Sequence, residues 1–529
     1  MELTRDNYYE NEAKILKDIE NSEFIAFDLE FSGLIPSRFK IYDTPEENFQ
    51  KTRVMAENYR IIQLGITPFI RKDTNSKEYI AKPYYIYVFP SERISNNRFD
   101  FFLESIIFNR EHGCDFNKWI KKGVSYLNNE QLKKLTERIM SGNINKYEPK
   151  NTSSFKNIVL YKEQDKIRYK NFLEKFEKFY QNSEEKIFKH EKIVRHLLLY
   201  FLNKLDDDKR KKIFIEFKDE TIGEETKSYI FIHKLNSYEE KQQRINKENN
   251  ELFSSIEREK GVKNIIEKIA SSKKPIIGHN CFIDLLFIMS HFMDEIPNNF
   301  NTFKLKLKNE FKGGIYDTKY LYNISKFNFG ESQDEKNNIN LECLYINLCK
   351  ENQKLEKDQK ILIEIPKNEN FVDYLDEEKK QIKFHQADYD SFTTGCAYIY
   401  MKNIFGENFI KEGENKLNCY HGLYSCYDLN NLDKNEKYLN NSSDAYVILF
   451  NEKKSINNET MLKINEEVIK SKFVNYKLYP KDLGGKCIVF INSENKNDFI
   501  QICSKYKEYF NIVNIAEYKE GLKNKNNNK

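Results

Sequence analysis

The segment FIAFDLEF, residues 24–31, constrains the fold of this 529-residue chain more than any other segment. Its first four residues are apolar, as in a strand that is buried on both faces. Asp28 and Glu30 follow two positions apart, and side chains at i and i+2 of a strand share one face. Two carboxylates on one face of a buried strand repel each other and lose hydration, which a bound cation offsets. The segment therefore predicts a core strand that carries a metal site.

The spacing of these two acids is weak support when taken alone. With 82 Asp and Glu residues in the chain, chance supplies about 13 acid-x-acid pairs, most of them on solvated faces. The apolar run before Asp28 distinguishes this pair from the others.

Two further sequence signals carry acids. Asp284 follows Gly278-His279-Asn280, where an apolar strand turns into an apolar helix. Such an Asp commonly caps its helix, but ligands also collect where strand ends meet helix starts. His385 and Asp390 form an H-x4-D pair at a helix expected to begin near Asp388, which places His385 in the preceding loop. Chance supplies roughly one such pair, so it decides nothing alone.

The order of these signals is more informative than any one of them. A D-x-E strand, an Asp after a strand–helix turn and a late H-x4-D is the arrangement of DEDDh exonucleases. Four carboxylates, at Asp28, Glu30, Asp284 and Asp390, suit two Mg²⁺ ions, with Mn²⁺ as a substitute, because both prefer oxygen ligands. Two such ions activate a water and stabilise the leaving oxygen. His385 is then expected to be the general base that takes the proton of the water.

The remaining pattern predicts an α/β fold with several domains. Strand patterns at 60–69 and 84–90 alternate with helical patterns at 7–20 and 101–108. Strand-like pieces among long charged helices then predict a small inserted α/β domain, and the chain ends in a βαββαβ order typical of RNA-recognition modules. The expected domains are a first exonuclease part at 1–155, an inserted nucleic-acid-binding-type domain at 156–262, a second exonuclease part at 263–428, an RNA-recognition-like domain at 441–519 and a disordered tail at 520–529.

Composition excludes some classes of protein. The formal net charge is +4, so the chain is no histone-like polycation. No run of about 18 apolar residues occurs, so no membrane helix is expected. The nine Cys residues are an odd number at irregular spacings, which is typical of a reducing compartment.

Several longer stretches resemble motifs of the poly(A)-specific ribonuclease family. They are FIAFDLEFSGL (24–34), GCDFNKWIKKGVSYLN (113–128), IIGHNCFID (276–284), YDTKYL (316–321) and HQADYDSFTTG (385–395), where Asp388 replaces the usual Gly. The resemblance spans nearly the whole chain. It implies an RNase H-like DEDD exonuclease core, in which helices flank a mixed sheet. It also implies an Mg²⁺-dependent 3′-to-5′ exoribonuclease that shortens poly(A) tails and releases AMP.

The resemblance also implies substrate contacts and partners. Phe31 and Leu34 would line the terminal nucleotides, and Phe116 and Lys319 would contact RNA. Core packing is the alternative for the first three, and a surface charge is the alternative for Lys319. The implied substrate is RNA with a 3′ poly(A) tail, the implied assembly is a homodimer, and the implied locations are the nucleus and the cytoplasm.

Two departures limit the resemblance. The insert lacks the Arg-x3-His motif of the family, so its contacts with RNA are not predicted. The family stacks the RNA cap on a Trp of the terminal module, whereas the only Trp here is Trp119, in the exonuclease part. Tyr479 is the nearest substitute, and cap binding is not predicted. Tyr446 is a candidate for stacking a base from the first strand of the module, with core packing as its alternative.

Two other functions remain open. A trimmer of small-RNA 3′ ends would share the same core, although some such trimmers carry a C-terminal membrane anchor and this chain ends in GLKNKNNNK. A non-catalytic RNA-binding scaffold is disfavoured by the intact set of four acids and His385. DNA proofreading is disfavoured because no polymerase segment follows the exonuclease motifs.

Overall fold

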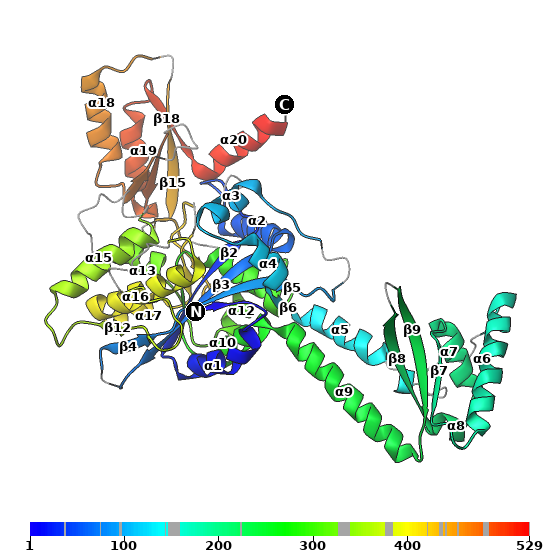
Figure 1. Cartoon of the computed structure of the whole chain (residues 1–529). Coiled ribbons are helices and arrows are strands. Elements are labelled where there is room, and N and C mark those ends of the chain that lie inside the picture. The colour runs from blue at the N-terminus through cyan, green and yellow to red at the C-terminus, as the bar shows by residue number, and fades with distance from the viewer. Residues whose placement is uncertain are drawn as a thin grey trace. The chain divides into compact units, whose positions relative to one another are not determined.

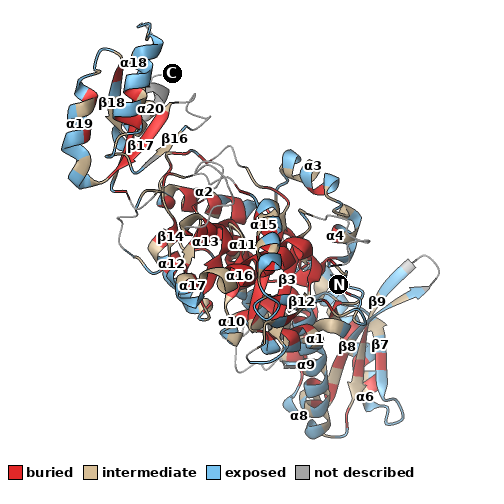
Figure 2. Ribbon diagram, turned by 90° about the vertical axis from the view of Figure 1, so that its left-hand side faces the viewer, coloured by how far each residue is buried: buried red, intermediate tan, exposed pale blue. Residues whose placement is uncertain are grey.

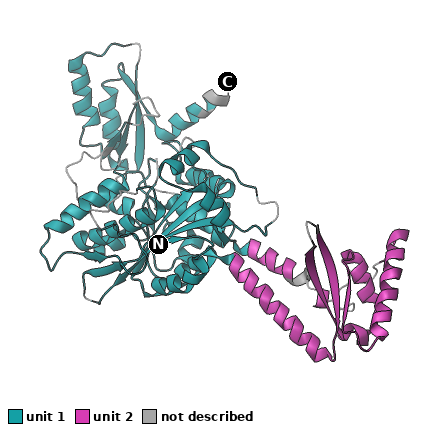
Figure 3. Ribbon diagram, in the orientation of Figure 1, with its two compact units in different colours: residues 1–130, 260–529 teal, residues 131–259 magenta. Residues whose placement is uncertain are grey.

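The computed structural model of the chain (Figure 1) describes two compact units, residues 1–130 with 260–529 and residues 131–259 (Figure 3). It describes all residues except 36–38, 75, 95–97, 143, 147–158, 223–224, 326–338, 376–383, 420–421, 433–436, 440–441, 452–453, 480–485 and 528–529. The domain boundary predicted between residues 155 and 156 lies outside the described residues, and the division into domains stays a prediction.

An eleven-stranded mixed sheet organises the first unit. Its main path runs β1 (Glu2–Leu3), β5 (Tyr84–Pro90), β3 (Ile61–Arg71), β2 (Phe24–Phe31), β10 (Ile276–Gly278), β11 (Ile315–Asp317), β13 (Lys416–Leu417) and β14 (Tyr427–Asp428). Off this path, β4 (Glu78–Ala81) pairs with β3 and β12 (Leu362–Glu364), and β6 (Val124–Tyr126) pairs with β5. The strands predicted at 24–31 and 84–90 are confirmed at both ends. β2 lies between antiparallel β3 and parallel β10, inside the sheet.

Helices cover both faces of this sheet. They are α1 (Tyr8–Asn21), α2 (Pro45–Asn58), α3 (Leu103–Glu111), α4 (Phe116–Lys122), α10 (Val262–Ser272), α11 (Phe282–Ile288), α12 (Phe300–Glu310), α13 (Thr318–Ile324), α15 (Leu341–Lys354), α16 (Ala387–Phe405) and α17 (Glu407–Glu412), while α5 (Asn129–Gly142) leads into the second unit. Buried residues gather on β3, α11 and α16 (Figure 2). No helix among the described residues is long and apolar enough to cross a membrane.

The two faces of β2 meet different helices. Phe27 lines a small apolar cavity with Ile266 of α10, on one face. On the other face, the Phe24 ring lies 5.0 Å from the ring of Tyr398 in α16. Because side chains alternate along a strand, Asp28 projects toward α16, as Phe24 does. The alternation therefore directs the acids of β2 toward the helix that carries Asp390.

The second unit has a sheet and a core of its own. Its elements are α6 (Glu163–Gln181), β7 (Ile187–Glu191), α7 (Arg195–Lys204), α8 (Asp207–Lys211), β8 (Ile213–Ile222), β9 (Glu225–Lys234) and α9 (Tyr238–Lys260). The strands form an antiparallel sheet in the order β7-β9-β8. Phe172 and Phe176 of α6, Phe201 of α7, and Ile230 and Ile232 of β9 belong to one buried cluster. The insert is a small α/β body, as the sequence predicted.

A βαββαβ module closes the first unit. It comprises β15 (Asp444–Phe450), α18 (Asn458–Ile464) with a π-helical turn (Asn465–Ile469), β16 (Tyr476–Leu478), β17 (Cys487–Ile491), α19 (Lys496–Ser504), β18 (Phe510–Asn514) and α20 (Ile515–Asn527). The predicted order of elements is confirmed, and the sheet order is β16-β17-β15-β18.

The end of this module differs from the prediction. The sequence analysis expected a disordered tail from residue 520, but a helix, α20, follows β18 directly and continues to Asn527. Asn514 Oδ1 accepts the Ala516 N–H at 2.9 Å, a side-chain turn that favours helix initiation. Ile515 is buried, and Lys519 pairs with Glu47 of α2. These tertiary contacts outweigh the polar composition of the segment.

Both faces of the module sheet are covered. Tyr446 is 5% exposed and its ring lies 6.1 Å from that of Phe499 in α19, so core packing is the interpretation that holds. On the opposite face, Ile488 and Phe490 belong to a buried cluster with Ile41, which precedes α2. Tyr438, Leu423 and α20 complete the cover of this second face.

Candidate metal and catalytic site

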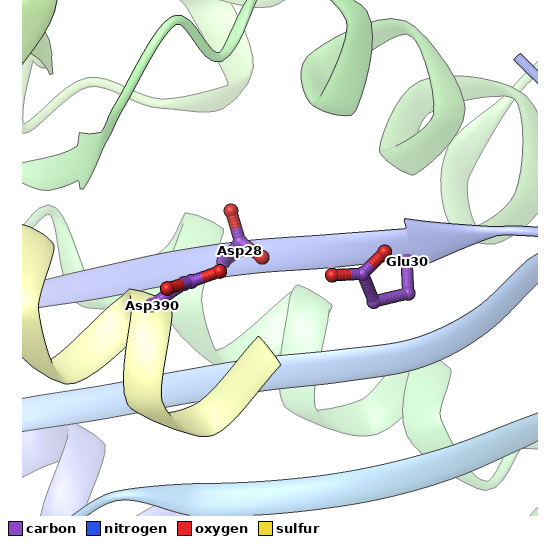
Figure 4. Close-up of side chains that lie close together, drawn as sticks. All are labelled: Asp28, Glu30 and Asp390. Atoms are coloured by element: carbon purple, nitrogen blue, oxygen red, sulfur yellow. The ribbon is translucent and has the colours of Figure 1, made fainter. Parts of the chain in front are cut away.

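Three of the predicted metal ligands converge in space. Asp28 and Glu30 of β2 and Asp390 of α16 each offer a carboxylate oxygen, and these oxygens lie within 4.8 Å of one another. Figure 4 shows the three side chains pointing toward one another from β2 and the first turn of α16. The structure thus brings Asp390 close to Glu30, although 360 positions separate them in the sequence. Their roles as ligands stay predictions.

Asp284 lies at the edge of this cluster. It occupies the first turn of α11. After burial and the charge of Asp390, the charge of Asp284 is a further cause that raises the pKa of Asp28 and of Glu30. Its oxygens do not join the 4.8 Å group among the described residues. Asp284 thus lies near the three converging acids without belonging to their group, and its role as a metal ligand stays a prediction.

The site strongly disfavours negative charge when no cation is present. Burial, followed by repulsion from Asp390, Asp284 and Glu30, holds the pKa of Asp28 well above its usual range. Burial raises the pKa of Asp284 and of Asp390 to about 7. Asp390 Oδ1 is buried without a hydrogen-bond partner among the described residues. An oxygen-only donor set with an unpartnered buried oxygen fits a hard divalent cation such as Mg²⁺.

His385 lies in the loop before α16, as predicted. Its backbone N–H donates to Asp390 Oδ2 at 2.9 Å, and its φ angle is 68°, in the left-handed region. Burial, followed by the charge of His112, lowers the pKa of His385. The neutral imidazole is the form that can accept a proton. The predicted role as base stays a prediction.

Gly65 lets α16 approach the sheet, and the sequence analysis missed it. It lies opposite Asp28 in the pairing of β2 with β3. A Cβ at this position would stand 1.8 Å from the carbonyl oxygen of Ala387, at the start of α16. The absence of a side chain therefore brings the first turn of α16, with Asp390, close to Asp28. An isolated Gly within a strand pattern signals such an approach, so the sequence contained a usable sign.

Asp317 is a second residue that the sequence analysis did not single out. It is fully buried and accepts backbone N–H groups from Asn280, at 2.9 Å, and from Cys281, at 3.2 Å. It also caps α13 by accepting the N–H of Lys319 and that of Tyr320. One carboxylate thus ties the start of α11 to the start of α13. Burial raises its pKa, and backbone donors oppose that effect.

Asp388 adds a further buried carboxylate near the cluster. Its side chain accepts a hydrogen bond from the hydroxyl of Tyr374, and its backbone carbonyl accepts one from the hydroxyl of Ser391. Its charge raises the pKa of Asp390, after burial, which is the largest cause. The residue that departs from the family pattern thus adds to the negative charge around the site.

The three predicted apolar contacts to RNA are partly buried. Phe31 packs its ring 4.2 Å from that of Phe287, and the Leu34 N–H donates to Ser105 Oγ at 3.0 Å. Phe116 is half-buried in a small aromatic cluster at α4. Each side chain keeps some exposed surface, and their contacts with RNA stay predictions.

Lys319 differs from a simple surface charge. It is 7% exposed, and its Nζ donates to the carbonyl oxygen of Ile339. The alternative of a solvated surface charge is therefore wrong. The contact between this ammonium and a phosphate stays a prediction.

Comparison with known proteins identifies the family. A sequence model of the CAF1 family ribonucleases matches residues 3–398. Poly(A)-specific ribonuclease PARN of Xenopus laevis is 27% identical over 435 residues, which are 79% of this chain and 65% of that protein. PARN of Homo sapiens is 30% identical over 426 residues, 77% of this chain and 62% of that protein. The pre-piRNA 3′-exonuclease trimmer of Bombyx mori is 27% identical over 341 residues, 63% of this chain and 60% of that protein.

These relatives confirm the resemblance that the motifs indicated. The chain spans between 60% and 65% of their lengths. The mixed sheet flanked by helices and the family match confirm the predicted α/β exonuclease core. Because the matched segment covers most of the sequence and contains all of the converging acids, the chain belongs to the CAF1 family of ribonucleases.

Proposed function

We propose that the chain is a divalent-metal-dependent 3′-to-5′ exoribonuclease that shortens poly(A) tails and releases AMP. The observation that carries the proposal is the convergence of Asp28, Glu30 and Asp390 within 4.8 Å in a member of a ribonuclease family. A cluster of partly buried carboxylates with raised pKa values is costly without a positive counter-charge. Such a cluster destabilises a structural core, whereas a metal-dependent phosphodiesterase uses it to hold its cations.

The residues of the site have two proposed roles, metal binding and proton transfer. Asp28, Glu30, Asp284 and Asp390 would hold two Mg²⁺ ions or, in their place, Mn²⁺. Bound ions would supply charge stabilisation to the attacking and leaving oxygens. His385 would accept the proton of the attacking water, since its lowered pKa keeps the ring neutral near pH 7. The backbone N–H of His385 also donates a hydrogen bond to Asp390 Oδ2, which fixes the orientation of that carboxylate.

The proposed substrate is RNA with a 3′ poly(A) tail. Support comes from the relatives named poly(A)-specific ribonuclease, which match most of this chain. Phe31, Leu34 and Phe116 retain exposed surface on which bases can stack or pack. Lys319 would contact RNA after its ammonium leaves the carbonyl of Ile339. Cap binding is not part of the proposal, although Tyr479 is 45% exposed.

A second candidate function is the trimming of small-RNA 3′ ends. The similarity to the Bombyx mori trimmer favours it, because this relative is as identical to the chain as PARN of Xenopus laevis. Both functions use the same cleavage chemistry and differ in the preferred base. A non-catalytic scaffold would bind RNA and leave it intact.

Cleavage of homopolymers tests these functions against one another. Purified protein, with Mg²⁺ or with EDTA, is given end-labelled strands of A, U, C and G. Stepwise shortening from the 3′ end of the A strand alone supports the deadenylase. Equal shortening of all four strands supports the trimmer. Tight binding without cleavage overturns both enzymes in favour of the scaffold.

Substitution of the acids tests the site itself. Asp28→Ala and Asp390→Ala should each lower the cleavage rate by at least about 10³-fold while the far-UV spectrum is unchanged. His385→Ala should lower kcat more than it weakens Mg²⁺ binding. Wild-type cleavage by either Asp variant would sink the assignment of the site.

The homodimer and the location in nucleus and cytoplasm also belong to this proposal. Phe101 and Leu103, before and at the start of α3, are 52% and 68% exposed, so Leu103 is a convenient position at which to probe association. Sedimentation of wild type and Leu103→Asp measures the assembly, and imaging of the tagged chain measures the location. A wild-type monomer at micromolar concentration would overturn the dimer.

A further inference from the structure

The C-terminal turn of α3 meets the loop that holds His385. The ring of His112, which follows α3 directly, lies 4.6 Å from the ring of His385 at an interplanar angle of 73°. The ring of Phe108 lies 4.9 Å from that of His385 at 69°. Both neighbours thus meet the His385 ring in edge-to-face geometry, which is a favourable arrangement for aromatic rings.

His112 is itself held in place. Its Nδ1 lies 2.7 Å from the carbonyl oxygen of Phe108, so this nitrogen donates its proton to that carbonyl. The two rings of Phe108 and His112 are 4.2 Å apart. The His112 carbonyl accepts the side-chain N–H of Gln386 at 3.3 Å. One residue therefore contacts both His385 and the next residue of its loop.

His385 needs such support because its backbone is strained. A φ angle of 68° is unfavourable for a residue with a side chain, and it persists only where the surroundings fix it. The N–H donated to Asp390 fixes the peptide group but not the ring. Among the described residues, the His385 ring has ring contacts with Phe108 and His112 and no side-chain hydrogen bond. The direction of the imidazole therefore depends on these two contacts.

We propose that His112 is a positioning residue for His385. Its ring packs against the His385 ring, and its backbone carbonyl binds Gln386, so His112 holds both the loop and the direction of the imidazole. The inference rests on the proposed function, in which His385 accepts the proton of the attacking water. His112 itself touches neither metal ligands nor reacting atoms in this arrangement, and it acts through His385.

The test combines two substitutions with a double-mutant cycle. His112→Ala removes the ring, whereas His112→Phe keeps a ring in the same place. Glu111→Ala changes an exposed neighbour on the same turn and serves as the matched control. Each substitution is introduced into the wild-type protein and into the His385→Ala variant. The values of kcat and KM are then measured on end-labelled oligo(A) with Mg²⁺.

A positioning role predicts a defined pattern. His112→Ala lowers kcat roughly tenfold or more, because misorientation of a catalytic group by a fraction of an ångström is costly. KM stays within about twofold of wild type, since no contact with RNA is lost. His112→Phe recovers most of kcat, and Glu111→Ala equals the wild type. In the His385→Ala background, His112→Ala has no further effect, because the residue through which it acts is gone.

Other outcomes overturn the inference in distinguishable ways. Wild-type kcat in His112→Ala shows that the contact positions nothing. An equal loss of kcat in both backgrounds shows a merely structural role. A raised KM with unchanged kcat shows a contact with RNA instead. If the wild-type protein cleaves no strand, or if Asp28→Ala cleaves as well as wild type, the proposed function fails and this inference fails with it.

Discussion

At the scale of single residues, the site is a set of carboxylates that the fold forces together. Asp28, Glu30 and Asp390 share a space in which their charges repel and their hydration is reduced. The pKa of each is raised, and that of Asp390 reaches about 7. The protein therefore stores electrostatic strain at this point, which a bound cation releases.

This strain gives the metal-free protein an unusual pH dependence. A carboxyl with a raised pKa in the folded state keeps its proton between about pH 4 and pH 7, whereas the unfolded chain has lost it. The unfolded state then binds fewer protons, so the contribution of these groups to the free energy of unfolding falls as pH rises through this window. The effect disappears when a cation keeps the carboxylates charged.

Asp28→Asn should therefore stabilise the metal-free protein, and more so at pH 8 than at pH 5. The gain in free energy of unfolding caused by Asp28→Asn should be larger at pH 8 than at pH 5 by on the order of 1–3 kcal/mol, since one pKa unit corresponds to about 1.4 kcal/mol. Urea unfolding of both proteins in EDTA measures it. Added Mg²⁺ should stabilise the wild type at pH 8 by more than it stabilises the variant. A difference that does not change with pH would contradict the account.

At the scale of elements, the site depends on how closely α16 approaches β3. Gly65 permits this approach, because a Cβ there would meet the backbone of Ala387 at 1.8 Å. The ring of Phe69 similarly fills the space over Gly395, farther along α16. The distance between β2 and α16 thus sets the distance between Asp28 and Asp390.

Gly65→Ala should separate these elements. Overpacking of this kind costs about 1–3 kcal/mol, and here backbone rather than a flexible side chain must move. We expect a lower urea midpoint and a lower kcat, because Asp390 moves away from Asp28. Gly521→Ala is the matched control, since nothing lies within 4 Å of its Cβ position. Unchanged stability and kcat in Gly65→Ala would show that α16 can move away without cost.

The sequence predicted elements better than it predicted contacts between them. The bounds of β5 follow from an apolar run that ends before Ser91, and those of β2 follow from a run that begins apolar and continues through the alternating acids to Phe31. The sequence predicted that Asp28 and Asp390 serve one site only through the order of the motifs, and it did not predict the face of the sheet on which Asp28 projects. Nothing in the local pattern revealed that His112 contacts His385, because the two lie on segments joined only by tertiary packing. Helix α20 was missed for the same reason, since burial of Ile515 stabilises a segment that composition marks as a tail.

At the scale of the whole molecule, the chain divides into two bodies with separate cores. Residues 131–259 bury Phe172, Phe176 and Phe201 against their own sheet, and this cluster contains no residue of the first unit. A unit with its own core is expected to fold alone.

The isolated segment 131–259 should therefore unfold cooperatively. Phe176→Ala within it should lower the free energy of unfolding by about 3–5 kcal/mol, because the ring is fully buried. Phe253→Ala is the control, since that side chain is 47% exposed and should change little. Urea titration followed by circular dichroism measures both. A broad, non-cooperative loss of signal from the unsubstituted segment would contradict independent folding.

The covered sheet of the C-terminal module has a consequence for any ligand that would bind to it. In modules with this order of strands, an open sheet face stacks bases, but here Ile488 and Phe490 pack against Ile41 and Leu423. A base can reach that face only in molecules where this packing has opened, so the apparent affinity is the intrinsic affinity multiplied by the open fraction. A buried apolar interface keeps that fraction small. Any ligand for this sheet face would therefore compete with the protein's own side chains for the same surface.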